Sequence, residues 1–166
     1  FTKLSSLAKE ITNLRKLSSQ KIEKEILPIL SDMGMKEAVL KINIIENEFL
    51  STNGENDIEF LFNANRGGEL SPISKVISGG ELSRLMLALK AVLSKKQSMP
   101  TIIFDEIDTG VSGDIASKVG NIMKEMSINH QIIAITHLPQ IAAKSNYHFK
   151  VFKNTTEDST YSEMKL

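Results

Sequence analysis

The chain has 166 residues, of which 41% are hydrophobic and 24% charged, enough for one domain with a core and an appended arm. Twenty basic and twenty acidic residues cancel, so the overall charge gives no reason to expect binding to nucleic acid or an anionic membrane. The lack of cysteine excludes disulfides and cysteine-ligated metals and fits a reducing compartment. No apolar run approaches the roughly 20 residues that span a bilayer, and the first ten residues lack the apolar segment of a signal peptide. The start at Phe1 rather than methionine suggests a piece of a longer protein.

Residues 1–27 are expected to form one long helix, ended by Pro28 and Gly34. The apolar residues that share one face at the 3-4-3 spacing of a coiled-coil seam are Leu4, Leu7, Ile11 and Leu14. Two heptads are too few to establish an independent coiled coil. A helix packed on its own domain and the root of a longer arm are therefore equally good interpretations.

Two antiparallel hairpins are expected, one after this helix and one at the end of the chain. Residues 38–50 are rich in β-formers, and 57–63 alternate apolar and polar side chains after a turn-forming stretch. Residues 63–72 then form a loop that contains two glycines and a proline. Alternation in 147–153 and 159–166, across a polar turn, predicts the closing hairpin.

The stretch SGGELSRLMLALK, residues 78–90, predicts a glycine-containing turn that leads directly into a helix. The expected buried stripe of that helix consists of Leu82, Leu85, Met86 and Leu89. Gly79 and Gly80 have no side chain, so a ligand can approach the backbone closely. The unpaired amides at the start of the helix, the positive end of its dipole and the Ser78 hydroxyl together suit a phosphate. A simpler interpretation is a capping box, in which Ser78 caps the helix and Glu81 lies three residues on.

Two short apolar strands are expected after this helix, each ending in residues with catalytic chemistry. The first, within TIIFDEID (101–108), ends at the adjacent carboxylates Asp105 and Glu106. Such acids at the carboxyl end of a core strand indicate a ligand site, because buried charge is costly unless it is paired or bound to a metal. The equally good alternative is that both acids face solvent in a loop. The second strand, QIIAITH (131–137), follows a helix that runs to about Met126. It ends at His137, for which the alternative interpretation is a polar cap without a catalytic role.

The order of these motifs resembles that of ABC-type ATPases. SGGELSR resembles their signature motif in the variant of the SMC and RecN branch, Asp105 and Glu106 resemble the Walker B pair, and His137 resembles the switch histidine. The tracts IEFLFNAN, PTIIFDEIDTGVSG and AITHLPQIAA look specifically like the RecN family of bacterial DNA-repair proteins, over roughly residues 30 to 155. The resemblance implies an α/β fold, namely the C-terminal lobe of an ABC-type head. Core strands with flanking helices and β-hairpins would occupy residues 31–166, and residues 1–30 would be the end of a coiled-coil arm.

The resemblance also implies roles for individual residues. Asp105 would hold Mg²⁺ through water, and Glu106 would orient or deprotonate the attacking water. His137 would contact the γ-phosphate of ATP. The signature residues that would bind a nucleotide held on the opposite subunit are Ser78, Gly79, Gly80 and Glu81. The D-loop between subunits would include Thr109, Gly110 and Ser112. The common ABC pattern has aspartate at the position of Ser112, which puts any contact by that carboxylate in doubt.

The sequence contains no G-x-x-x-x-G-K-[ST] loop to hold the α- and β-phosphates. In the family this Walker A loop belongs to an N-terminal lobe, so the chain is expected to need that lobe for ATP hydrolysis and to expose a sheet face towards it. The resemblance further implies a homodimer through the heads, a role in DNA double-strand break repair and recombination, and a cytoplasmic, nucleoid-associated location without a membrane partner. The alternatives are the ATPase subunit of a membrane transporter, which predicts glutamine in place of Glu81, and a catalytically silent dimerisation lobe.

Overall fold

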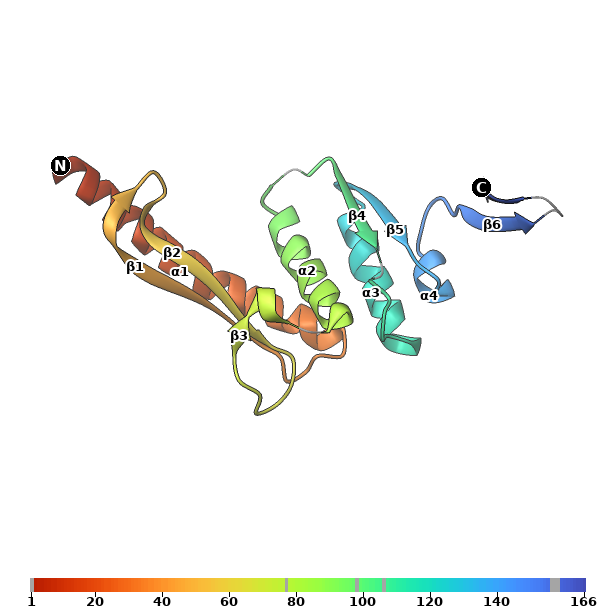
Figure 1. Cartoon of the computed structure of the whole chain (residues 1–166), viewed down its shortest axis with the longest axis horizontal. Coiled ribbons are helices and arrows are strands. Elements are labelled where there is room, and N and C mark those ends of the chain that lie inside the picture. Colours follow the sequence, from red (N-terminus) through yellow and green to blue (C-terminus); the bar gives the residue numbers. More distant parts are fainter. Residues whose placement is uncertain (1, 77, 98, 106, 156–158) are drawn as a thin grey trace.

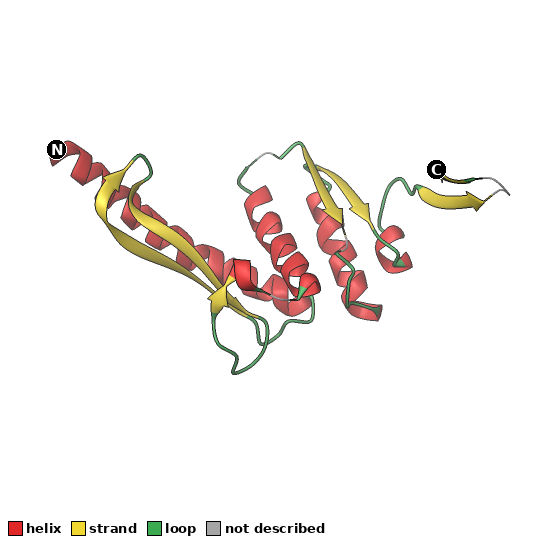
Figure 2. Ribbon diagram, in the orientation of Figure 1, coloured by secondary structure: helices red, strands yellow, loops and turns green. Residues whose placement is uncertain are grey.

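The computed structural model describes residues 2–76, 78–97, 99–105, 107–155 and 159–166. Its elements, in chain order, are α1 (Thr2–Asp32), β1 (Val39–Ser51), β2 (Gly54–Asn63), β3 (Ser71–Pro72), the 3-10 helix η1 (Ile73–Lys75), α2 (Gly79–Ser94), β4 (Thr101–Asp105), α3 (Gly113–Met126), β5 (Gln131–Ile135), α4 (Pro139–Ala142), β6 (Lys150–Thr155) and β7 (Thr160–Lys165). Three parts follow one another along the long axis. An arm of α1 and the β1–β2 hairpin leads to a body of α2, α3, α4, β4 and β5, and the β6–β7 hairpin forms the far end (Figure 1). The mixed helix and strand content confirms the expected α/β class (Figure 2).

Helix α1 continues one turn past Pro28, so the expectation that this proline ends the helix was wrong. Pro28 lies on the exposed side, whereas Ile26 and Leu30 on the opposite side are fully buried. That burial is large enough to offset the roughly 3 kcal/mol cost of a proline inside a helix. The helix ends as expected at Gly34, whose φ of +85° completes a Schellman motif. In that motif the amide of Met35 donates to the Leu30 carbonyl at 2.9 Å.

The β1–β2 hairpin confirms the expected antiparallel pair and packs along α1. The register is continuous from Val39 opposite Asn63 to Glu46 opposite Asn56, and shifts before the turn. The turn is shorter than the seven-residue stretch expected, because Gly54 already pairs with Ser51. The strand β3 adds two residues beside β2 inside the expected loop.

A polar contact joins the hairpin to α1 in the middle of the arm. The Thr12 hydroxyl lies 2.6 Å from Asn56 Oδ1, and both residues are buried. Arg15 donates to the backbone carbonyls of Asn53 and Asn56. The hairpin therefore covers the side of α1 that carries Thr12, and not the side that carries the heptad residues.

The heptad residues of α1 are exposed. Leu4, Leu7, Ile11 and Leu14 have exposed fractions of 54, 48, 39 and 57%. The hairpin turn at Gly54 reaches the edge of this stripe at Ile11 and leaves Leu4, Leu7 and Leu14 uncovered by the described residues. The C-terminal part of α1 packs in the core through Ile26 and Leu30, as a helix packed on its own domain would, and the exposed N-terminal stripe is what the root of a longer arm would present.

The body is built on the parallel pair β4–β5, with α2 and α3 beside it (Figure 1). One face of this pair is buried through Ile102 and Phe104, which belong to the same hydrophobic core as the C-terminal part of α1. The opposite face is open, since Ile103 and Ile135 are 61 and 57% exposed. The expected exposed sheet face is thus confirmed.

Helix α2 buries Leu85 of the predicted stripe fully and Leu82 and Leu89 partly, but its buried face is rotated from the predicted one. Its buried residues are Gly80, Leu85, Leu87, Ala88, Ala91 and Val92. Met86 was expected in the core and is instead 40% exposed. The helix is in contact with both α1 and α3, so its buried stripe is wider and rotated relative to a single 3-4-3 seam.

The expected closing hairpin is confirmed as β6–β7, paired from Lys150 opposite Lys165 to Thr155 opposite Thr160. It projects from the body at the C-terminal end of the molecule (Figure 1). Among the described residues no helix is both long and apolar enough to cross a membrane.

Candidate phosphate-facing edge

Ser78 is the N-cap of α2, as the simpler interpretation predicted. Its backbone is extended, and its hydroxyl oxygen accepts from the Glu81 amide at 3.4 Å. One of the unpaired amides of the first turn is satisfied in this way. Ser78 remains exposed, so the cap leaves the hydroxyl accessible from outside the chain. Capping and phosphate contact are therefore compatible.

The two signature glycines have different environments. Gly79 is exposed, and a β-carbon built on it would meet nothing within 4 Å. Gly80 is buried, and a β-carbon there would lie 2.5 Å from the backbone carbonyl oxygen of Thr109. Gly80 thus permits the signature helix to approach the D-loop stretch, whereas the space beside Gly79 is open to a molecule outside the chain.

Arg84 reinforces the contact between the signature helix and Thr109. Its Nη1 donates to the Thr109 carbonyl at 3.2 Å, and its buried Nε has no hydrogen-bond partner among the described residues. Burial lowers the pKa of the Arg84 guanidinium, and the nearby Glu81 carboxylate partly opposes that shift. The sequence reasoning did not single out Arg84. Its position six residues after Ser78, one turn beyond Gly80, was the available signal.

The carboxyl ends of β4 and β5 lie side by side at the edge of the sheet. Asp105, the last residue of β4, pairs in register with Ile135, the last residue of β5. His137 follows two residues later, and both Asp105 and His137 are exposed. Asp105 makes no ion pair with any residue that the structure describes. Glu106, the expected catalytic carboxylate, lies outside the described residues.

The expected D-loop residues are on the surface. Thr109, Gly110 and Ser112 are all exposed. Ser112 is the N-cap of α3, but its hydroxyl makes no capping hydrogen bond. Of these three, only Thr109 is brought into contact with the signature helix, through Gly80 and Arg84.

Asp108 is a further residue of this edge, which the sequence reasoning missed. It is 2% exposed, and its Oδ2 accepts from the Thr136 hydroxyl at 2.5 Å and from the His137 amide at 2.9 Å. The same oxygen lies 3.1 Å from His137 Nδ1. The signal in the sequence was a third acid only three residues after Asp105, inside the same DEID stretch.

The hydrogen bonds to Asp108 also determine its ionisation. Burial by itself would raise the pKa of this carboxyl, but the hydrogen bonds from Thr136, the His137 amide and its own amide, together with the His137 ring, outweigh burial and lower the pKa. Asp108 is therefore an ionised, buried carboxylate near neutral pH. Such a group is stable only because its lone pairs are occupied by donors.

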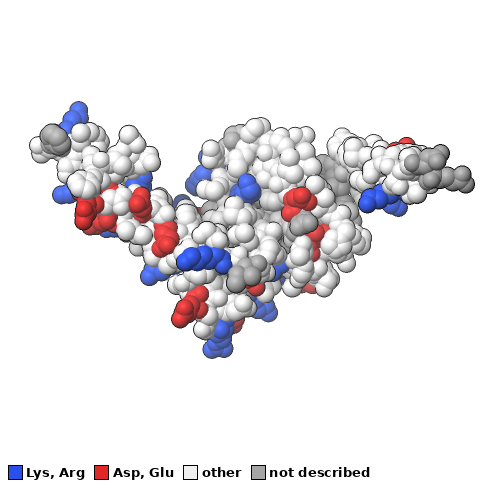
Figure 3. Space-filling model, viewed as in Figure 1, with Lys and Arg blue, Asp and Glu red and all other residues white. Residues whose placement is uncertain are grey.

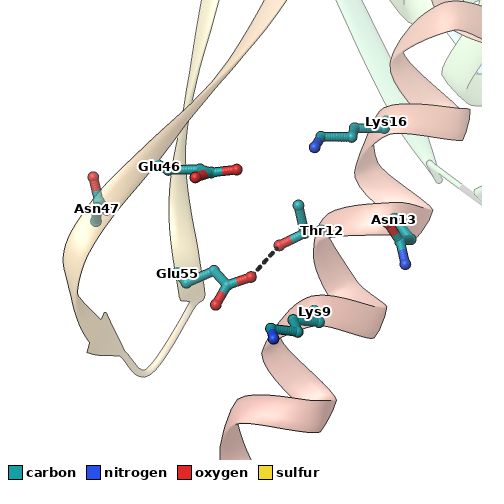
Figure 4. Close-up of a pocket in the computed structure, with 7 residues that line it drawn as sticks. All are labelled: Lys9, Thr12, Asn13, Lys16, Glu46, Asn47 and Glu55. Carbon is teal, nitrogen blue, oxygen red and sulfur yellow. Dashed lines mark hydrogen bonds between the residues drawn. The ribbon is translucent and has the colours of Figure 1, made fainter.

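Open grooves of the described structure include one beside the signature turn and one on the arm. One, of 320 Å³, borders the signature turn and includes Phe62, Asn63, Glu69, Lys75, Ser78 and Glu81. The other, of 340 Å³, lies on the arm between α1 and the hairpin, where Lys9 and Lys16 face Glu46 and Glu55 (Figure 4). The charges of this second groove balance, and it contains none of the residues predicted for the site.

Among the described residues no group of three or more histidine and acidic side chains is arranged to hold a metal ion. A single exposed carboxylate such as Asp105 matches the way Mg²⁺ is bound beside nucleotide phosphates, with one or two carboxylates and several waters.

Solved structures with a similar fold are heads of SMC proteins. An SMC head with an extended coiled coil from Pyrococcus furiosus, bound to the C-terminal domain of ScpA, aligns with 92% of this chain and 36% of its own, at a TM-score of 0.61 and 19% identity. A structure from a study of ATP-driven dimerisation of SMC ATPases aligns with 93% of this chain and 89% of its own, at a TM-score of 0.54 and 19% identity. With this likeness, the fold is that of the C-terminal lobe of an ABC-type ATPase head.

Relatives found by sequence show to which family with this fold the chain belongs. DNA repair protein RecN of Rickettsia bellii is 39% identical over 99% of this chain, and that of Haemophilus influenzae is 32% identical over 99%. RecN of Bacillus subtilis is 43% identical over 70% of the chain. No protein-family model matches. The chain belongs to the RecN family and spans about 30% of the length of the first two relatives.

Proposed function

We propose that this chain is the half of an ATPase head that supplies the signature motif, the Walker B acids and the switch histidine. The observation that carries the proposal is the meeting of the two strand ends. Parallel strands β4 and β5 end together, Asp105 and His137 are exposed there, and Asp108 hydrogen-bonds the His137 loop to the β4 loop. Ligands of open α/β sheets bind at such carboxyl ends.

The proposed roles follow the chemistry of each group. Asp105 holds Mg²⁺ through a carboxylate oxygen, and the ion supplies positive charge beside the β- and γ-phosphates of ATP. Glu106 orients or deprotonates the attacking water, and His137 contacts the γ-phosphate. Ser78 and Gly79 contact the γ-phosphate of ATP bound to the opposite subunit. In support, the Ser78 hydroxyl is exposed and the space beside Gly79 is open.

The remaining signature and D-loop residues shape that surface. Gly80 and Glu81 belong to the first turn of α2, where Gly80 contacts Thr109 and Glu81 completes the cap of Ser78. Thr109, Gly110 and Ser112 form the exposed stretch that is proposed to reach the opposite subunit. The Ser112 hydroxyl takes the place of the carboxylate found in most ABC sequences.

The proposed partners are the Walker A lobe of the same protein and a second head. The open face of β4–β5, with Ile103 and Ile135 exposed, supports docking of the Walker A lobe. The exposed heptad stripe of α1 supports a coiled-coil end in residues 1–30. The β1–β2 hairpin packs along α1 but belongs to the proposed lobe, residues 31–166. Because each head holds ATP against the signature of another, the functional unit is a homodimer through the heads.

The biological role is proposed from the relatives. The curated relatives are named DNA repair proteins, so we propose that the full protein uses ATP in DNA double-strand break repair and recombination, in the cytoplasm at the nucleoid. The chain has no net charge and the face in Figure 3 intermingles acidic and basic side chains, so the DNA part of the proposal rests on the relatives and not on a basic surface of this face. The RecN relatives favour this role over that of a transporter subunit.

The test is ATP hydrolysis by this chain with and without a separately produced Walker A lobe. We expect turnover only in the mixture, lost on Ser78→Arg and on Glu106→Ala. Asp57→Asn, an exposed change in the arm hairpin, is the matched control and keeps full turnover. Robust hydrolysis by this chain alone would overturn the split-site proposal. If the lobes bind each other but the mixture is inactive, the silent dimerisation lobe becomes the better interpretation.

A further inference from the structure

Asp108 connects the loops that follow the two parallel strands. Its Oδ2 accepts from the His137 amide and from the Thr136 hydroxyl, so one buried oxygen holds the backbone at the end of β5. The Thr136 hydroxyl in turn accepts from the Leu138 amide at 3.0 Å, just before α4 begins. The path of the chain on both sides of His137 is therefore fixed by the same group of hydrogen bonds.

The third contact of Asp108 acts on the imidazole ring itself. His137 Nδ1 lies 3.1 Å from Asp108 Oδ2. This is an ion-pair contact rather than a hydrogen bond. The negative charge of the ionised carboxylate beside Nδ1 nevertheless favours the ring form that carries its proton on that nitrogen. The second nitrogen of a histidine is then the one available to a ligand, as in sites where a carboxylate orients a metal-bound histidine. The His137 side chain is 75% exposed, which leaves Nε2 accessible at the open edge.

From this geometry we propose that Asp108 is the positioning residue of His137: it holds the backbone at His137 by hydrogen bonds, attracts the protonated Nδ1 by its charge, and so leaves Nε2 facing the open edge at the ends of β4 and β5. Only the identity of the group that Nε2 contacts, a nucleotide γ-phosphate, rests on the proposed function. The lowered pKa of Asp108 supports the positioning role, because the carboxylate stays ionised near neutral pH. Asp108 touches neither substrate nor metal in this assignment and acts entirely through His137.

The orientation is tested first by NMR on the ¹⁵N-labelled chain. The imidazole nitrogen shifts of His137, assigned by comparison with His137→Ala, report which nitrogen carries the proton in the neutral ring. We expect the Nδ1–H form in the wild type. Asp108→Asn is expected to yield a substantial Nε2–H population, because an amide offers a donor as well as an acceptor. Asp57→Asn, the same chemical change at an exposed site, leaves the shifts unchanged.

A second variant keeps the test decisive if Asp108→Asn does not fold. Thr136→Val removes the hydroxyl donor to Asp108 while keeping the shape of the side chain, and it is expected to shift the His137 tautomer in the same direction but less. Circular dichroism melting confirms that each variant is folded. An Nε2–H ring in the folded wild type, or an unchanged tautomer in folded Asp108→Asn, overturns the positioning role.

Catalysis is tested in the full-length protein. We expect Asp108→Asn to lower kcat by roughly 10–100-fold, the range seen for partners that orient ligating histidines, with KM for ATP little changed. In a His137→Ala background the same change is expected to have no further effect, because it acts through that ring. Losses that multiply in the double variant would show that Asp108 acts independently of His137. If His137→Ala alone leaves kcat intact, the proposed function of His137 fails, while the NMR result still decides the positioning role.

Discussion

The carbonyl oxygen of Thr109 lies 2.5 Å from the position that a β-carbon on Gly80 would occupy. The first turn of α2 and the loop after β4 are therefore packed against each other within one chain, through the backbone at Gly80 and through the side chain of Arg84. The neighbouring Gly79 has no such constraint. The two glycines of one motif consequently have separable roles, one in packing and one facing outward.

The first prediction concerns these glycines. Gly80→Ala is expected to lower the free energy of unfolding by about 1–3 kcal/mol, because the methyl group displaces Thr109 and the backbone cannot yield as a flexible side chain does. Gly79→Ala is expected to change it by less than about 0.5 kcal/mol. Urea titration of both variants measures the difference. Equal destabilisation by the two substitutions would contradict the packing role of Gly80.

The second prediction concerns the end of α1. Gly34→Ala is expected to lower the free energy of unfolding by about 1–2 kcal/mol, because alanine is strained in the left-handed backbone at φ +85°. The loss is expected to be larger still, because the new β-carbon would lie 2.6 Å from Ile115 Cδ1. Ile115→Val removes that methyl group. In the Ile115→Val background the cost of Gly34→Ala should fall towards the backbone term alone. Thermal unfolding of the four proteins of this cycle gives the coupling, and strict additivity would exclude the contact.

The third prediction concerns the polar contact inside the arm. Thr12→Val leaves Asn56 buried without its hydroxyl partner, and Asn56 Nδ2 already has no partner among the described residues. We expect Thr12→Val to lower the free energy of unfolding by about 1–3 kcal/mol. The double variant Thr12→Val with Asn56→Leu should recover most of that loss, since it removes both polar groups. Hydrogen exchange along β2 reports the local stability, and a double variant less stable than Thr12→Val would argue against the prediction.

The fourth prediction is a pH dependence that originates at Asp108. The pKa of this carboxyl is lower in the folded chain than its ordinary value of 3.8, so folding favours the ionised form. The resulting stability is fully present above about pH 4 and is lost as the pH falls through the folded-state value. Asp108→Asn lacks this contribution at every pH. The stability difference between wild type and Asp108→Asn is therefore expected to shrink on acidification from pH 6 to pH 3, as measured by urea unfolding. A difference that stays constant over that range would contradict the pKa assignment.

The sequence determined most of the local structure because its patterns are strong there. Alternation around Ile58 and Phe60 predicted the arm hairpin, and the apolar runs before Asp105 and His137 predicted the two parallel strands. The motifs themselves identified the family, and relatives named RecN confirm that assignment. These inferences succeeded because each depends on residues close together in the chain.

Tertiary structure decided what depends on packing between distant segments. Pro28 lies inside α1 because Ile26 and Leu30 are buried against the body. Met86 is exposed because the face of α2 that packs in the core carries Leu85 and Leu87 instead. Likewise, Gly80 differs from Gly79 through its contact with Thr109, and Asp108 reaches His137 across 29 positions of sequence. A local pattern specifies which face of a helix or strand is apolar. Which neighbour meets that face, and which buried carboxylate meets which ring, depends on how the elements are placed in space.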